Sequence, residues 1–346
     1  MAIPRRTFVA LSAASAALHG QKTSEKPPLG IGFLGANHSH AEGKLKVVRA
    51  SAEWRIVGVA ESNPKVQEDV RALGLPLISR DELLHHPEIS VVAVESAVRD
   101  HAPDGKAVLQ AGKHLHLEKA PADNLPAFAE IVNLARQGNR ILQVGYMWRY
   151  HPGVTKALEA AREGWLGDIY LVKSTIGNKL APERRAEWGE FRGGVMFELG
   201  GHVIDPVVRL MGRPRKVTPI LHTDGRFGDD FKDNTAAVLE WDKAIGIVQA
   251  TTLQPDSSRF RAIEIHGTNG SAIVNPIEPP GLAIDLGKAA GPYRKGFQTI
   301  PMPEYHRYAD DFVELAAVVR GERRLRVTLD EDLLVEEVLL RASGMA

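Results

Sequence analysis

Short apolar runs alternate with amphipathic stretches through the first half of the chain. The runs lie at residues 29–34, 55–60, 91–94, 114–117 and 140–144, and the segments between them have the composition of helices. Apolar runs of this length, separated by helices, are typical of parallel strands that are buried on both faces. The pattern predicts an α/β unit over residues 29–148, with a doubly wound parallel sheet of the Rossmann type.

The pattern changes after residue 149. A helix is expected over residues 154–163, and strands are then expected in series at 169–176, 217–222, 235–241, 245–253, 262–267 and 271–275. Consecutive strands joined by short turns predict an open, mostly antiparallel sheet. Helices with apolar faces at 305–320 and 329–342 close the chain. Residues 149–346 are therefore expected to form a C-terminal α+β domain.

The first twenty residues have the order of an export signal. Arg5 and Arg6 precede a short apolar run that ends in small residues between Ser12 and Ala17. Such a run is too short to span a bilayer, and the paired arginines resemble a twin-arginine signal. We expect residues 1–20 to be the signal, residues 21–28 a linker, and the protein to be periplasmic or extracellular. An amphipathic first helix of the mature protein is the alternative.

Composition excludes several classes of function. Lys plus Arg and Asp plus Glu each number 43 in 346 residues, so the formal net charge is zero. No overall field then favours nucleic acid, or a membrane once the signal is removed. The chain has no cysteine, which excludes disulfides, thiolate zinc sites and a cysteine nucleophile. A small molecule is the expected partner.

The first apolar run ends at Gly35, where a tight turn is needed. In the glycine fingerprint that begins there, Asn37 and His40 stand where two more glycines are usual. Ser39 and Glu42 are expected to form a capping box that starts a helix, whose N-terminus would receive a pyrophosphate. The candidate cofactor-binding residues of this loop are Gly35, Asn37, His38, Ser39 and His40. A flavodoxin-like domain without a dinucleotide remains the alternative.

Polar residues at the ends of later strands add to this candidate site. Glu61 can accept hydrogen bonds from both adenosine ribose hydroxyls and would repel a 2′-phosphate, which favours NAD over NADP, although NADP remains open. Lys119 can donate to a substrate hydroxyl oxygen. Solvated surface charges are the alternative for both. The other candidate cofactor-binding residues are Ser96, Glu118 and Lys119 itself. His114 and His116 share one strand face but have no acidic or thiol partner nearby, so no metal site is predicted.

One later stretch places a carboxylate and an imidazole on the same face of a helix. Within residues 193–205, Glu198 and His202 are four positions apart and Asp205 follows three later. An imidazole titrates near neutrality and can take a proton from an alcohol, while a carboxylate can hold its ring. The alternative is a core histidine flanked by surface charges.

Taken together, these motifs resemble the Gfo/Idh/MocA family of dinucleotide-dependent sugar and polyol oxidoreductases. The residues that carry the likeness are Gly112-Lys113-His114 through Glu118-Lys119, Gly145 to Pro152, Gly164 to Asp168, and Gly193 to Asp205. The chain departs from the family pattern in the glycine turn, at Ala120 in place of a proline, and at Glu198 in place of an aspartate.

The resemblance implies roles for particular residues. Lys119, Glu198 and His202 occupy the catalytic lysine, aspartate and histidine positions. By the family mechanism, His202 takes the hydroxyl proton, Lys119 polarises the same oxygen, and the hydride passes to the nicotinamide. The candidate substrate residues are Arg149, Tyr150, Trp188 and Asp205, and His101 matches a position near the cofactor and is a further candidate cofactor-binding residue. The family's open sheet also implies a homo-oligomer, either a dimer or a tetramer.

The expected function is oxidation of a secondary hydroxyl of a sugar, sugar derivative or polyol. Because soluble NAD is scarce outside the cytoplasm, an exported enzyme is expected to hold its cofactor tightly and regenerate it in place. A glycoside-cleaving enzyme that oxidises, eliminates and re-reduces its substrate is the alternative. A non-catalytic sugar- or dinucleotide-binding relative is a third reading.

Overall fold

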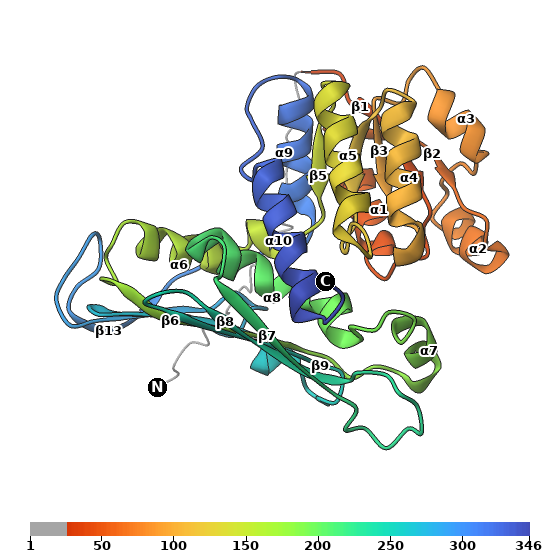
Figure 1. Ribbon diagram of the computed structural model, residues 1–346. Helices are drawn as coiled ribbons and strands as arrows, with labels where there is room; N and C mark the ends of the chain where they lie inside the picture. Colours follow the sequence, from red (N-terminus) through yellow and green to blue (C-terminus); the bar gives the residue numbers. More distant parts are fainter. Residues whose placement is uncertain (1–25) are drawn as a thin grey trace, which may run out of the picture.

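The computed structural model describes residues 26–346, so the predicted export signal lies outside the described residues (Figure 1). The first domain alternates strands and helices. Its elements are β1 (Leu29–Leu34), α1 (Ala41–Ala50), β2 (Trp54–Ala60), α2 (Pro64–Ala72), α3 (Arg80–His85), β3 (Val91–Val94), α4 (Val98–Gln110), β4 (His114–Leu117), α5 (Leu125–Gln137) and β5 (Leu142–Val144).

The five strands form one parallel sheet in the order β2-β1-β3-β4-β5. Helices α4 and α5 pack together on one face, and α1 lies on the other, as Figure 1 shows. The strands are almost entirely buried because helices cover both faces. The predicted doubly wound sheet is confirmed.

The second domain begins with short helices and continues as a sheet. Its elements are η1 (Met147–Tyr150), α6 (Pro152–Arg162), β6 (Ile169–Gly177), η2 (Pro182–Arg184), α7 (Arg185–Trp188), α8 (Val195–Met211), β7 (Lys216–His222), β8 (Asn234–Glu240), β9 (Ile245–Thr251), η3 (Ser258–Phe260), β10 (Ala262–Gly267), β11 (Gly270–Val274), β12 (Leu282–Leu286), β13 (Gly296–Ile300), α9 (Ala309–Val319) and α10 (Leu329–Ala342).

The eight strands of this domain lie in the order β13-β12-β11-β10-β6-β9-β8-β7. All neighbours are antiparallel except β6 and β9. The predicted open, mostly antiparallel sheet is therefore confirmed, and β12 and β13 extend it beyond the expected strands. Helices α6, α8 and α10 pack on one face.

The other face of this sheet is open in the described chain. Along β9, exposed residues alternate with buried ones, so one side of the strand meets the helices and the other meets solvent. Large apolar side chains on this side are between 39% and 61% exposed: Tyr170, Ile220, Ile245, Ile247 and Phe297.

The last two helices connect the domains. α9 returns to the first domain, where the Trp54 indole N–H donates to the carbonyl of Phe312 at 3.0 Å. α10 packs against both α5 and α8. The chain thus does not divide at a single point near residue 149, since α9 covers the parallel sheet. Among residues 26–346, no helix has the length and apolar character needed to cross a bilayer.

Candidate functional site

The candidate site begins at the turn after β1. Gly35 has a φ angle of +79°, and a Cβ atom added there would lie 2.5 Å from the backbone of Ser96. Only glycine fits this position without displacing Ser96. In the loop that follows, the backbone N–H groups of Asn37 and Ser39 donate to no acceptor among the described residues. Free N–H groups before a helix are suitable donors to a phosphate.

Ser39 does not cap α1. The N-cap residue is His40, and no side chain accepts a hydrogen bond from the first turn of the helix. The predicted capping box of Ser39 and Glu42 is therefore wrong. The ring of His40 instead contacts Glu118, with 3.1 Å between Nδ1 of His40 and Oε1 of Glu118. Ser39 lines a cleft that also contains Lys119 and His202.

Lys119 follows β4 and extends its ammonium to α8 of the second domain. Its Nζ donates to the backbone carbonyl of Glu198 at 3.0 Å and lies 3.8 Å from the carboxylate of that residue. α8 starts after Gly194, whose φ angle is +52° and whose missing Cβ leaves room for a neighbouring carbonyl. The peptide bond between Lys119 and Ala120 is cis. The ammonium of one domain thus contacts the helix that carries His202.

His202 is 1% exposed, and neither ring nitrogen has a hydrogen-bond partner among the described residues. The rings of His40, Trp148 and Tyr146 surround it, with centroids 5.7, 6.0 and 6.3 Å away. Burial, and then the charge of Lys119, lower the pKa of His202 well below 6.5. His202 is therefore a neutral imidazole that can accept a proton, and not a core histidine with satisfied hydrogen bonds. We call Lys119 and His202 the candidate catalytic pair.

Glu198 and Trp188 line the cleft beside this pair. Glu198 stands one helical turn before His202, and burial raises the pKa of its carboxyl. Trp188 lies at the end of α7, with the Arg184 guanidinium 5.5 Å from its ring centroid. The structure thus brings Lys119, Glu198, His202 and Trp188 together, as their predicted roles require.

The space for a cofactor lies along the carboxyl ends of β1, β2 and β3. A cavity of about 510 Å³ there is lined by Glu61 and Ser96, among others. The carboxylate of Glu61 accepts hydrogen bonds from the backbone N–H groups of Ala36 and Asn63, both at 2.7 Å. The Ser96 hydroxyl is buried and has no partner among the described residues.

Two further cavities connect this space to the candidate catalytic pair. One has a volume of about 290 Å³ and shares Asn37 with the first, and the other, of about 220 Å³, is lined by both members of the pair. The order of groups fits a dinucleotide: a carboxylate at the ribose end, free N–H groups at the phosphates, and a lysine and histidine at the reacting end.

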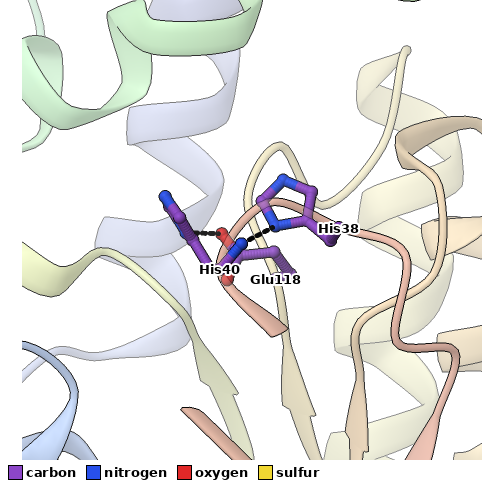
Figure 2. A group of neighbouring side chains, drawn as sticks. All are labelled: His38, His40 and Glu118. Atoms are coloured by element: carbon purple, nitrogen blue, oxygen red, sulfur yellow. Dashed lines mark hydrogen bonds and ion pairs between the residues drawn. The ribbon is translucent and has the colours of Figure 1, made fainter. Parts of the chain in front are cut away.

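Figure 2 shows His38, His40 and Glu118, whose nearest ligand atoms lie within 4.8 Å of one another. This spacing is suitable for a metal ion, but the neighbouring positive charges would repel one. The ammonium of Lys119 lies 3.5 Å from the Nε2 atom of His38, and Lys44 is ion-paired with Glu118. A cation here would meet two ammonium groups, so the surroundings of this cluster do not suit a metal ion.

A buried ion cluster lies behind Lys119. Lys44 on α1 is fully buried and contacts Glu118, Glu95 (2.6 Å) and the Nε2 atom of His116 (2.9 Å). Burial opposes the charge of Glu118, but Lys44 and two histidines hold its pKa well below the usual value. Burial raises the pKa of Glu95 to about 8, against the effect of Lys44. Glu118 also accepts from the backbone N–H of Lys119 at 2.9 Å, so it supports the lysine and does not line the cleft.

Three predicted substrate residues do not line these cavities. Arg149 is buried and bridges Asp205 and Asp332, each 2.7 Å from Nη2. The Tyr150 hydroxyl donates to Glu314 at 2.7 Å in the interior. We therefore correct the assignment of Arg149, Tyr150 and Asp205: their side chains form ion pairs and hydrogen bonds in the interior and do not face the cavities.

His101 also has a different position from the one expected. It is fully buried, with Nδ1 2.8 Å from the carbonyl of Ala120 and Nε2 3.0 Å from the carbonyl of Ser96. A neutral imidazole donates to only one of these, and burial lowers the pKa of His101. His101 thus positions the segment after Lys119 and does not face the cofactor space.

Sequence reasoning missed several polar residues that the structure brings to the site: Lys44, Asn178, Arg184, Arg261, Arg307 and Tyr308. None belongs to a recognisable motif. Lys44 stands two positions from the exposed Lys46 in α1, and the helical spacing alone does not tell which lysine turns inward.

A parallel sheet with a glycine turn, joined to a second domain that supplies a buried histidine opposite a lysine, defines a two-domain NAD(P)-dependent oxidoreductase. The model of an oxidoreductase family with an NAD-binding Rossmann fold matches residues 29–146, and that of the Gfo/Idh/MocA C-terminal domain matches residues 154–273. Together they span more than half of the chain, which belongs to the Gfo/Idh/MocA family.

Individual relatives are distant. The chain is 24% identical to levoglucosan dehydrogenase from Pseudarthrobacter phenanthrenivorans, over 85% of this chain and 84% of that enzyme. It is 26% identical to the scyllo-inositol 2-dehydrogenase (NADP(+)) IolW from Bacillus subtilis, over 60% of this chain and 58% of that enzyme.

The same fold occurs among solved structures. The UDP-N-acetylglucosamine 3-dehydrogenase GnnA from Acidithiobacillus ferrooxidans aligns over 92% of this chain and 98% of its own, with a TM-score of 0.76 and 17% sequence identity. At this level of identity the likeness concerns the fold alone.

Proposed function

We propose that this protein oxidises a secondary hydroxyl of a sugar, sugar derivative or polyol, using the candidate catalytic pair. The observation that carries the proposal is the position of His202: a buried, neutral imidazole with two unpartnered nitrogens, lining the same cavity as the ammonium of Lys119. The names of the dehydrogenases similar to this chain support a carbohydrate or polyol substrate.

The chemistry of the pair follows from its charges. The neutral imidazole of His202 takes the hydroxyl proton, and the ammonium of Lys119 stabilises the negative charge that develops on the same oxygen. Glu198 orients that ammonium through its backbone carbonyl. NAD(P), when bound, supplies the acceptor for the hydride that leaves the carbinol carbon.

Glu61 supports NAD as the preferred cofactor. Its carboxylate is fixed at the end of β2 by two backbone N–H groups, and it lines the cavity where the adenosine ribose would lie. A 2′-phosphate at this position would meet a negative charge. We further propose that the cofactor is held tightly, since the sequence begins with the features of an export signal.

The open face of the second sheet supports a homo-oligomer. Its exposed apolar side chains lie on the adjacent strands β6 and β9 and on the two edge strands β7 and β13, so a second copy of the chain that covers this face could bury them. Sedimentation velocity of the purified protein tests this proposal, and a monomer at all concentrations would contradict it.

Two assays test the proposed activity. The protein is denatured and any released nucleotide is identified by mass, and the intact protein is then incubated with a panel of sugars and polyols with added NAD. We expect a steady rise in NADH absorbance. Release of an aglycone from an aryl glycoside without net NADH would instead indicate the glycoside-cleaving cycle. Neither signal, with a bound dinucleotide present, would contradict the proposed reaction.

A further inference from the structure

Three arginines line the cavity beside the candidate catalytic pair: Arg184, Arg261 and Arg307. Two of them have carboxylate partners. Arg184 pairs with Glu187 at 3.0 Å, and Arg307 forms two contacts with the carboxylate of Glu278. The charges of these two arginines are therefore largely compensated.

Arg261 differs from the other two. It precedes β10, and its Nε and Nη2 atoms both donate to the carbonyl of Gly177 at 3.2 Å. Among the described residues it forms no ion pair. A carbonyl carries no full charge, so Arg261 has no ion-pair partner of its own. Burial and then Arg307 lower the pKa of Arg261, and the carboxylate of Glu278, which is paired with Arg307, opposes this shift only in part.

A second polar group beside Arg261 also lacks a partner. Asn178 follows directly after Gly177 and lines the same cavity. Its Oδ1 atom is buried, with no hydrogen-bond donor among the described residues. Buried polar atoms are usually paired, so a ligand with a hydroxyl or amide group is the expected donor. The second domain thus places a positively charged donor, Arg261, next to a neutral acceptor, the Oδ1 atom of Asn178, in the lining of this cavity.

The phosphates of a dinucleotide do not account for this wall. The free N–H groups suited to a pyrophosphate lie at Asn37 and Ser39, in the first domain. Arg261 lies on the second domain, and it lines neither the cavity of Glu61 nor the one that adjoins it. The charge of Arg261 therefore faces the substrate side of the cleft.

We infer that the substrate carries an anionic group, a carboxylate or a phosphate, which Arg261 binds while Asn178 accepts from a neighbouring hydroxyl. The inference deepens the proposed function and depends on it for the identity of the site. A sugar acid or a sugar phosphate carries the required anionic group, because a guanidinium binds a carboxylate or a phosphate through two parallel hydrogen bonds in a planar, bidentate geometry.

The kinetic test compares D-glucuronate, D-glucose 6-phosphate and D-glucose as substrates of the wild-type protein and of Arg261→Gln. We expect a higher kcat/KM for at least one anion than for glucose. Arg261→Gln should lower it about 10- to 100-fold for that anion, mainly through KM, and change it little for glucose. Arg261→Lys keeps the charge and should restore part of the loss.

Arg259→Gln is the matched control. Arg259 lies two residues earlier, its side chain is 81% exposed, and it pairs with Asp256 at 3.2 Å. Its loss removes the same charge from the same loop without touching the cavity, so all three kcat/KM values should stay unchanged. Equal losses for charged and neutral sugars in Arg261→Gln would overturn the inference.

A binding experiment tests the inference even if none of the three compounds is oxidised. The three compounds are titrated calorimetrically into each protein in the presence of NADH. Tighter binding of an anion than of glucose, lost in Arg261→Gln, supports the inference, and the pattern of binding separates a carboxylate from a phosphate ligand. Absent or equal binding of the three overturns it. Anion binding without oxidation of any sugar would reject the proposed function alone.

Discussion

Behind each residue of the candidate catalytic pair lies a buried cation that forms ion pairs with two carboxylates. Behind Lys119, Lys44 contacts Glu95 and Glu118. Behind His202, Arg149 contacts Asp205 and Asp332. All six of these supporting charges are at most 5% exposed, so each cluster needs its full set of partners to be stable.

The two clusters differ in how they reach the reacting groups. Glu118 of the first cluster directly contacts His40 and the backbone N–H of Lys119. The second cluster reaches His202 through packing and not through a hydrogen bond. Asp205 lies on the next turn of α8, and the Arg149 guanidinium lies 4.7 Å from the centroid of the Tyr146 ring, which packs against His202. The first cluster is thus part of the electrostatics of the site, whereas the second fixes the position of a helix. The predictions below test this difference.

The largest effect is expected from the pair itself. Lys119→Ala and His202→Ala should each lower kcat by about 10²- to 10⁴-fold, because one removes the charge that stabilises the alkoxide and the other removes the base. NADH binding, followed by tryptophan fluorescence, should persist. Activity within a few-fold of the wild type in both variants would remove our assignment of the site.

The next largest effect is expected from loss of the cation in either cluster, and its kinetic part should differ between the two. Lys44→Met leaves Glu95 and Glu118 without this buried cation, whereas Arg149→Met leaves Asp332 unpaired and Asp205 with only Arg209, at 3.5 Å. Each variant should lower the free energy of unfolding by about 3–5 kcal/mol. Urea denaturation measures this loss. Only Lys44→Met should also lower kcat/KM strongly, once rates are corrected for the folded fraction. Equal kinetic losses in both variants would contradict the distinction.

A smaller effect is expected at the cofactor end of the first domain. Glu61→Ser removes the carboxylate that would meet a 2′-phosphate. The ratio of kcat/KM for NAD to that for NADP should fall, by about tenfold for the loss of one charge repulsion of roughly 1.4 kcal/mol. Steady-state kinetics with each cofactor measures the ratio, and an unchanged ratio would show that Glu61 does not contact the ribose.

An effect of similar size concerns pH. Asp311 of α9 is buried near Lys44, and burial raises its pKa to about 7. The folded state then binds a proton more tightly than the unfolded state, so this carboxyl lowers stability as pH rises from about 4 to 7. Asp311→Asn should remove that slope and stabilise the protein at pH 8 by on the order of 1–3 kcal/mol.

Thermal unfolding of the wild type and Asp311→Asn at pH 5 and pH 8 checks this prediction. The gain should be larger at pH 8, because only there is the native carboxyl of Asp311 charged. An equal gain for Asp311→Asn at the two pH values would contradict the raised pKa.

The strands of both sheets could be predicted because their apolar runs have the right length and alternation. The run at β12 has the same alternation, Leu282-Ala283-Ile284-Asp285-Leu286, but the prolines that precede it interrupt the series of predicted strands. Lys119 and His202 could be predicted from their motifs and from the periodicity of α8.

The direction of side chains in irregular segments could not be predicted. Arg149 and Tyr150 stand in a motif near the cleft, but both lie in the short helix η1, whose turn points them into the interior. Arg261 reaches the cavity only because β10 pairs with β6 and brings it to Gly177. Such contacts depend on strand register, which the pattern of one sequence does not determine.

The account as a whole depends on a dinucleotide whose reacting ring lies between Lys119 and His202. A crystal structure of the protein with NAD and a substrate analogue tests this most directly. We predict the diphosphate at the backbone N–H groups of Asn37 and Ser39, the ribose at Glu61, and the nicotinamide beside the candidate catalytic pair. A nicotinamide far from either side chain, or a cleft that excludes the diphosphate, would contradict the account.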